Sequence, residues 1–161
     1  MDKTDVKILN ALKENSKQSV RDISKSIKIP PTTIHSRINK LKKEGIIKRF
    51  TIEIDNEKIG LKTSAYILVA LDSRYFQKTK QPESYASEEL MKNSSVEEAA
   101  NVTGSRDLVA KVRVRDMKDM DKFIMSLRGK EMILRTETMM ILHEGKDEKK
   151  GLDEGIVQDK D

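Results

Sequence analysis

The first third of the chain places apolar residues at helical spacing in short runs, and each run has a start signal. The first predicted helix begins near Asp2, whose carboxylate can cap it, and breaks at Asn15-Ser16. The second begins at Ser19, which forms a capping pattern with Asp22, and ends around Lys28. The apolar stripes are Val6, Ile8, Leu9 and Leu12 in the first helix and Val20, Ile23 and Ile27 in the second.

A third predicted helix follows a pair of prolines. Proline is tolerated at the first helical position, so we expect Pro31 to begin this helix and Gly45 to cap its end. Its buried face consists of apolar residues at i, i+4 and i+7, namely Ile34, Ile38 and Leu41. Two helices joined by so few residues cross steeply, which is the helix-turn-helix arrangement. The next stretch, Ile46–Asp55, alternates apolar and polar residues and predicts a short hairpin, or wing.

After Asp55-Asn56 the pattern changes to apolar runs and period-two alternation, with two further helical segments. The predicted order is strand, helix, strand, strand, helix, strand, over Thr63–Leu71, Tyr85–Lys92, Val96–Val102, Asp107–Arg115, Asp116–Leu127 and Leu134–Leu142. On the third segment we expect Val96, Ala100 and Val102 to share one face. This βαββαβ order is that of a ferredoxin-like sheet with both helices on one face. The uncovered face predicts a homodimer that packs sheet to sheet.

The sequence therefore predicts an α+β protein with two domains. A winged helix-turn-helix occupies residues 1–55, a linker 56–62 and a ferredoxin-like dimerisation domain 63–143. Residues 144–161 are polar and unpatterned, and we expect them to form a flexible tail.

The charge distribution singles out the N-terminal domain. The net charge is +5, with 14 Lys/Arg against 8 Asp/Glu in residues 1–60 and 18 against 19 in the remainder. Ten basic residues lie between Lys17 and Phe50. A basic domain joined to a neutral one indicates a polyanion-binding half, although a charge run is also typical of an ordinary solvated surface.

Composition excludes several classes of protein. The chain has no cysteine, so disulfides, thiolate zinc sites and thiol nucleophiles are impossible. It shows no Ser/His/Asp constellation, phosphate loop or paired-histidine metal motif, and Asp107 and His143 are the only faint catalytic candidates. We therefore expect neither an enzyme nor a cofactor or metal. Without a signal peptide or an apolar run of about 18 to 20 residues, the expected location is the cytoplasm.

The outward face of the third helix follows from steps of about 100° per residue away from Ile34. It offers hydroxyl, amide and ammonium groups, which contact base edges and phosphates in a DNA major groove. Because residues near the helix start usually reach the bases, we assign base reading to Thr32, Thr33, Ser36 and Asn39. Phosphate binding is assigned to Lys40, Lys43, Lys48 and Arg49. His35 flanks this face together with Thr33 and Lys40, and it is more readily a surface residue than a base reader. Arg37 lies nearer the core edge, where it could contact DNA or bridge the third helix to its neighbours.

Four alternatives remain open. The helix face could be an ordinary solvated surface or a winged-helix surface for protein contacts. The protein could also coat DNA as an architectural protein without much sequence preference, or sense a metabolite through its second domain.

A series of different short motifs lies along residues 2–143. They are Asp2…Asp5…Ile8-Leu9…Leu12, Arg21-Asp22-Ile23-Ser24, Thr33-Ile34…Arg37-Ile38…Leu41, Glu44-Gly45-Ile46-Ile47, Ile54-Asp55…Ile59-Gly60, Val102–Asp107 and Thr136-Glu137-Thr138. Together they resemble the Lrp/AsnC family of bacterial and archaeal regulators. The sequence departs from the family pattern at Pro30, where the family usually has a capping serine, at the long polar stretch Gln77–Ser84, and at Gly129–Met132.

The resemblance implies a transcription regulator that binds double-stranded DNA, dimerises and assembles further, commonly to octamers. It also implies that the second domain binds an amino acid or related effector at a dimer–dimer interface. Carried over by position, the effector residues are Thr103, Gly104, Ser105, Arg106 and Asp107 in one turn, Thr136 and Thr138 facing a neighbouring subunit's turn, and Tyr75. Asp107 could bind an ammonium group and the glycine turn a carboxylate, but the same turn could simply connect two strands.

Overall fold

The computed structural model describes residues 1–145 and 151–153, which belong to two compact units. The first unit comprises residues 1–53 together with the described C-terminal residues from Gly145 onward, and the second comprises 54–144. Most of the predicted tail, 144–161, lies outside the described residues.

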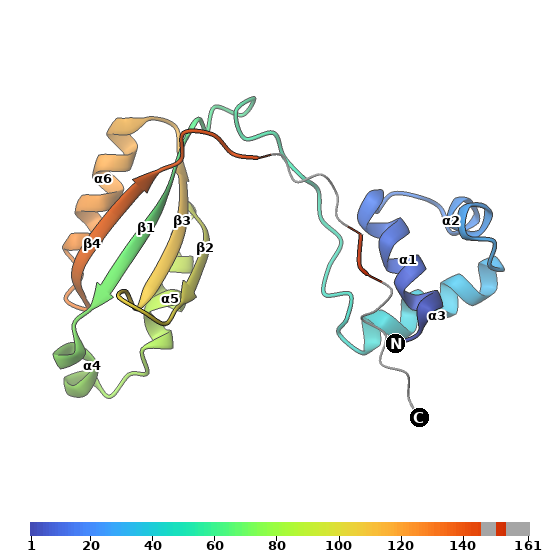
Figure 1. Cartoon of the computed structure of the whole chain (residues 1–161), viewed down its shortest axis with the longest axis horizontal. Helices are drawn as coiled ribbons and strands as arrows, with labels where there is room; N and C mark the ends of the chain where they lie inside the picture. The colour runs from blue at the N-terminus through green and yellow to red at the C-terminus, as the bar shows by residue number, and fades with distance from the viewer. Residues whose placement is uncertain (146–150, 154–161) are drawn as a thin grey trace. The chain divides into compact units, whose positions relative to one another are not determined.

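The helical unit contains α1 (Lys3–Glu14), α2 (Val20–Ile27) and α3 (Pro31–Lys43) (Figure 1). Asp2 and Asp5 form the start of α1 as a full capping box, because each carboxylate accepts the other's backbone N–H, at 2.9 and 2.8 Å. Ser19 Oγ caps α2 by accepting the Asp22 N–H at 3.1 Å, as predicted. The shared core of the unit is Ile8, Ala11, Ile23 and Ile34, with Leu12, Val20, Ile27, Ile29 and Ile38 packed against it.

The chain leaves α3 through a tight C-terminal turn. Gly45 has a φ of +72°, and its N–H donates to the Lys42 carbonyl at 3.1 Å while the Ile46 N–H donates to the Leu41 carbonyl at 2.9 Å. This turn needs a residue that tolerates the left-handed region, which is why glycine occupies it. The end of α3 at this glycine confirms the sequence prediction.

The hairpin predicted over Ile46–Asp55 was wrong. In the described chain no strand precedes Thr63, and residues 56–60 form only a turn. The alternating Phe50, Ile52 and Ile54 remain 48%, 70% and 50% exposed. An isolated hairpin is marginal in water unless its apolar face packs on something, and alternation alone supplies no such surface.

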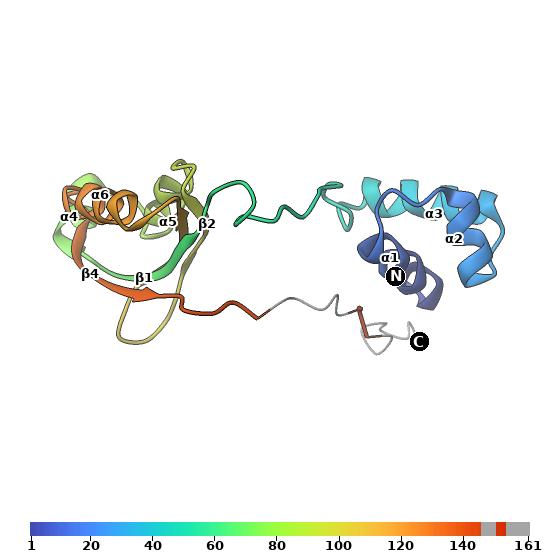
Figure 2. The same ribbon diagram turned by 90° about the horizontal axis from the view of Figure 1, so that it is seen from above.

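The second unit is a four-stranded antiparallel sheet in the order β2-β3-β1-β4. The strands are β1 (Thr63–Leu71), β2 (Val96–Asn101), β3 (Leu108–Val114) and β4 (Ile133–Met140). The helices α5 (Ser84–Met91) and α6 (Met117–Arg128) lie on one face of the sheet (Figure 2). This arrangement confirms the α+β class and the ferredoxin-like order of elements.

A short additional helix, α4 (Ser73–Thr79), was not predicted. Asp72 starts it by accepting the Arg74 N–H at 3.0 Å, and Phe76 is its buried residue. Seven residues with one buried side chain are too few to produce a recognisable helical period. The helix therefore accounts for part of the polar stretch that separates β1 from α5.

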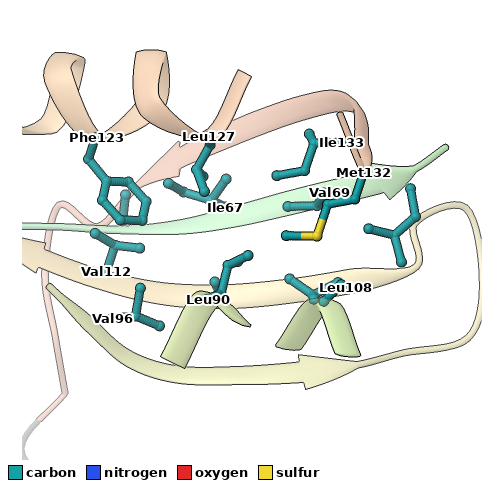
Figure 3. Close-up of a cluster of buried hydrophobic side chains, with 14 of the residues drawn as sticks. Ile67, Val69, Leu90, Val96, Leu108, Val112, Phe123, Leu127, Met132 and Ile133 are labelled. Carbon is teal, nitrogen blue, oxygen red and sulfur yellow. The ribbon is translucent and has the colours of Figure 1, made fainter. Parts of the chain in front are cut away.

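The core of the sheet unit lies between the sheet and the two long helices. Alternate residues of β1 and β3 point into it, and Leu90, Phe123 and Leu127 meet them from α5 and α6 (Figure 3). The inward strand residues are Ala65, Ile67, Val69 and Leu71 in β1 and Leu108, Ala110, Val112 and Val114 in β3. Because successive side chains of a strand point to opposite faces, the residues between these inward positions lie on the sheet face away from the helices.

The strand β2 departs from the predicted alternation. Its register with β3 shifts between Val96 and Glu98, so Ala99 pairs with Ala110 and packs against the core, while Ala100 pairs with Val109 on the opposite face. A bulge adds one residue and reverses the alternation beyond it. The expectation that Val96 and Ala100 share a face was therefore wrong, and Val102 lies beyond the strand.

The sheet face away from the helices carries exposed apolar residues beside a cluster of charges. Tyr66 and Met139 are 42% and 54% exposed there. Arg113, only 9% exposed, donates to Glu97 at 2.5 Å and to Glu144 at 2.6 Å, and Lys111 also pairs with both carboxylates. The hydrogen bonds from Lys111 and Arg113 hold the pKa of Glu144 below its ordinary range.

Candidate functional site

The outward face of α3 is polar and contains no acid. All 13 residues from Pro31 to Lys43 lack a carboxylate, whereas four carry a positive charge. Most of the predicted DNA-contacting side chains are exposed, namely Thr32, His35, Ser36, Asn39, Lys40 and Lys43 in α3 and Lys48 and Arg49 beyond it. Thr33 is only half-buried. The helix therefore brings together most of the residues that the sequence assigned to DNA contact.

Asn39 and His35 lie one turn apart on this face. The Asn39 Nδ2 and His35 Nε2 atoms are 3.1 Å apart, which is hydrogen-bond distance. Such a contact orients the Asn39 amide, whose paired donor and acceptor are the groups that recognise adenine edges. His35 is then a neighbour that positions Asn39 as well as a surface residue.

The start of α3 has no side-chain cap, as the sequence indicated. Pro30 occupies the capping position, and no side-chain hydrogen bond is made there. The two prolines themselves carry no N–H, so Thr32 and Thr33 hold the backbone donors at this helix end. Within the described residues these two donors have no hydrogen-bond acceptor.

Arg37 does not belong to the outward face. Its Nη1 donates to Asp2 and, at 3.0 Å, to Asp5, so it ties α3 to the capping box of α1. The Asp5 N–H and Arg37 together hold the pKa of Asp2 below its ordinary range. Asp5 itself is 2% exposed. The structural reading of Arg37 is the one that its contacts support.

The predicted effector turn lies between β2 and β3. Thr103, Gly104 and Ser105 are exposed, and Gly104 has a φ of +120°. Asp107 already has a hydrogen-bond partner within the fold, because one of its carboxylate oxygens accepts the Leu71 N–H at 2.8 Å. This bond joins the start of β3 to the end of β1, a role that cannot be predicted from local sequence patterns.

Arg106 reaches across β1 to β4. Its Nη2 donates to Glu137 at 2.7 Å and its Nη1 to the Ser105 carbonyl at 2.8 Å. Its Nε is buried and has no acceptor among the described residues. A buried guanidinium donor without a partner is uncommon in folded proteins.

The remaining predicted effector residues are not gathered at this turn. Thr136 and Thr138 pair with Val69 and Ile67, whose side chains are in the core, so both threonines point to the helix side of the sheet. Glu137, which Arg106 contacts, points to the other side. Tyr75 packs edge-on against Phe76, with ring centroids 5.1 Å apart, and lines a hollow with Tyr85 and Met132.

The described part of the chain offers neither a metal-binding cluster nor a membrane-spanning helix. No three His, Asp or Glu side chains there approach one another closely enough to hold a metal ion. None of the helices described is long and apolar enough to span a membrane.

Family models match both units. A winged helix-turn-helix DNA-binding model matches residues 1–48, and the Lrp/AsnC ligand binding domain model matches residues 64–150. An HTH-type transcriptional regulator from Pyrococcus abyssi is 34% identical over 149 residues, which cover 92% of this chain and 97% of that protein. Another, from Pyrococcus horikoshii, is 32% identical over 142 residues, which cover 88% and 89%.

Solved structures agree with these matches. AsnC from E. coli superposes with a TM-score of 0.77 at 26% identity, covering 89% of this chain and 93% of that one. A transcriptional regulator from Neisseria meningitidis, solved as a complex with L-Met, gives a TM-score of 0.82 at 22% identity, covering 95% and 96%. The second likeness shows a shared fold.

Proposed function

The chain belongs to the Lrp/AsnC family of DNA-binding transcription regulators, and we propose that it recognises a particular double-stranded DNA sequence through α3. The family makes it a regulator and not an enzyme. The observation that carries the proposal is the acid-free, largely exposed face of α3, with its polar groups at the start and its lysines at the end. This order matches a recognition helix whose first turns meet the bases.

In this proposal the two ends of α3 have different tasks. Ser36 and Asn39 read base edges, with Thr32 and Thr33 close to the same groove. The free N–H groups of Thr32 and Thr33 donate to a phosphate oxygen at the helix start, where the helix dipole favours negative charge. Lys40, Lys43, Lys48 and Arg49 bind phosphates and set affinity for any sequence.

Footprinting and binding titrations with alanine variants test this division. Ser36→Ala and Asn39→Ala should each reduce discrimination at one base position by about 1–3 kcal/mol. Lys43→Ala should weaken binding to all DNA sequences equally and reduce the slope of log affinity against log salt by about 1. Lys78→Ala, an exposed lysine in α4, is the control that should change neither. One unchanged site preference in all of these variants would overturn the assignment.

An architectural DNA-coating role is the second candidate, since phosphate contacts alone would support it. Competition with random DNA separates the two candidates. A specificity ratio near one favours coating, whereas a regulator should prefer its site by roughly a thousandfold or more.

We also propose that the sheet unit binds an amino acid or related effector at the Thr103–Asp107 turn. The ligand-binding-domain match supports this, as does the unpartnered Arg106 Nε, and a relative of the same fold is known as an L-Met complex. Because Asp107 already holds Leu71, only its other oxygen is available for an ammonium group. The competing interpretation is that this turn only connects β2 to β3 and binds no ligand.

A thermal-shift screen of the twenty amino acids tests the effector proposal. A ligand at 100 to 1,000 times its Kd should stabilise the folded protein by about 3–4 kcal/mol. Arg106→Met should abolish that shift, and Arg74→Met, which removes an arginine of another ion pair, should retain it. No shift with any amino acid would contradict an amino-acid effector.

The open sheet face supports a homodimer as the unit that binds DNA. Exposed Tyr66 and Met139 lie beside half-buried Leu68 on a face without helices. A two-fold pair would present two α3 helices and favour half-sites one helical turn, or a multiple of it, apart. Further association, up to an octamer, would be seen by sedimentation velocity of the full chain.

A further inference from the structure

The C-terminal segment returns to α1 and contacts one side chain there. Asn10 Nδ2 donates to the Leu152 carbonyl at 3.1 Å, and the Leu152 N–H donates to Asn10 Oδ1 at 2.6 Å. These residues are 142 positions apart in the chain. Nothing in the DNA-binding or effector proposals uses this pair.

The contact has the form of a peptide-recognition site. A carboxamide presents a donor and an acceptor side by side, as a peptide unit does, and here both engage the same residue's backbone. Such paired bonds require the segment to lie in one register and one direction. Gly151 lies directly against Asn10, where an added Cβ would be 3.4 Å from Oδ1, so the backbone approaches the carboxamide closely.

The side of α1 that carries Asn10 is covered. At 100° per residue Asn10 points about 160° away from Ile8, which faces α2 and α3. Even so, Asn10 is only partly exposed, Leu152 is half-buried, and Val6, one turn earlier on the same side, is fully buried. Leu152 is also the first apolar residue after Leu142 in an otherwise polar stretch.

We propose that Asn10 forms a docking point on α1 for the chain's own C-terminal segment around Gly151-Leu152. The segment is bound through its backbone, by the two hydrogen bonds, and anchored by the Leu152 side chain. Since α3 carries the DNA-reading face, docking occupies a different helix of the same unit.

Amide hydrogen exchange of the full-length chain, measured by NMR, tests the docking directly. The Leu152 amide should exchange at least tenfold more slowly than an unstructured amide, because it donates to Asn10. Asn10→Ala should remove this protection. Lys7→Ala, an exposed position on the same helix, is the matched control and should leave it intact.

Two backbone variants keep the test independent of any damage to α1. Leu152→Pro removes the donating N–H, and it should shift the Asn10 side-chain amide resonances to the positions seen when residues 151–161 are deleted. Asn10→Ala in the truncated chain should then cost no further thermal stability. Two results would overturn the proposal. One is a wild-type Leu152 amide that exchanges as fast as an unstructured amide, and the other is Asn10 side-chain resonances that shift neither with Leu152→Pro nor with the deletion.

The outcome is separable from DNA binding. Leu152→Pro should retain the wild-type DNA sequence preference, because the docking side chain is not on α3. A loss of preference accompanied by full retention of Leu152 protection in Asn10→Ala would contradict the docking assignment and leave the DNA-binding proposal in place.

Discussion

At the residue scale, the structure distinguishes polar side chains that face solvent from those already used within the fold. Arg37 was predicted near the core edge of the DNA-reading helix, as a DNA contact or a bridge between helices, and its guanidinium binds the Asp2–Asp5 capping box. Asp107, predicted to bind an ammonium group, accepts the Leu71 N–H with one of its carboxylate oxygens. Sequence position singled out both residues, but it did not show the partners that each contacts in the fold.

Arg37→Ala should destabilise the helical unit by about 2–3 kcal/mol, because it leaves the nearly buried Asp5 carboxylate without its cation. Urea unfolding monitored by circular dichroism measures the change. Lys40→Ala, which removes an exposed pair with Glu44 at 3.8 Å, is the control and should cost less than about 0.5 kcal/mol. Equal effects of the two substitutions would refute the structural role of Arg37.

At the element scale, helix starts and periods were well predicted because they depend on neighbours in sequence. The capping residues Asp2 and Ser19 and the glycine end of α3 all lie where the pattern placed them. The α4 helix and the β2 bulge were missed, since one is too short to show a period and the other interrupts the alternation. The absent hairpin shows the opposite error, in which alternation is present without a partner strand.

Ser19→Ala should destabilise the protein by about 1 kcal/mol, because the Asp22 N–H at the start of α2 loses its acceptor. Ser19→Gly should cost only a few tenths of a kcal/mol, since glycine also suits the capping position. Thermal unfolding of the two variants checks the difference. An alanine variant as stable as the glycine variant would show that the cap contributes nothing.

The charge cluster on the open sheet face gives the sheet unit an acid-sensitive contact. The pKa of Glu144 is lowered chiefly by its hydrogen bond from Lys111. Glu144 therefore contributes stability that is fully present above the unfolded pKa of about 4.5 and is lost as pH falls through the folded pKa. Glu144→Gln should therefore flatten the fall in stability below about pH 4.5. Glu98→Gln, at an exposed acid in β2, serves as the control. Identical acid transitions for wild type and Glu144→Gln would contradict this role.

At the scale of the whole molecule, the sheet has one face covered by helices and one left open, and the open face is the proposed dimer surface. Tyr66→Asp places a charge at the centre of that face and should convert dimers to monomers. Light scattering coupled to gel filtration measures the mass. Met125→Asp, at a more exposed apolar position on α6, should leave the dimer intact. A Tyr66→Asp protein that remains dimeric would place the interface elsewhere.

The sequence by itself determined the class of the fold, the order of its elements and the helix that faces outward. These follow from helical and strand periods, caps and charge, which are set by residues close in the chain. Only the tertiary structure decided the use of Arg37 and Asp107, the face on which Thr136 and Thr138 lie, and the return of Leu152 to Asn10. Each of these depends on contacts between residues far apart in sequence, to which local periodicity carries no signal.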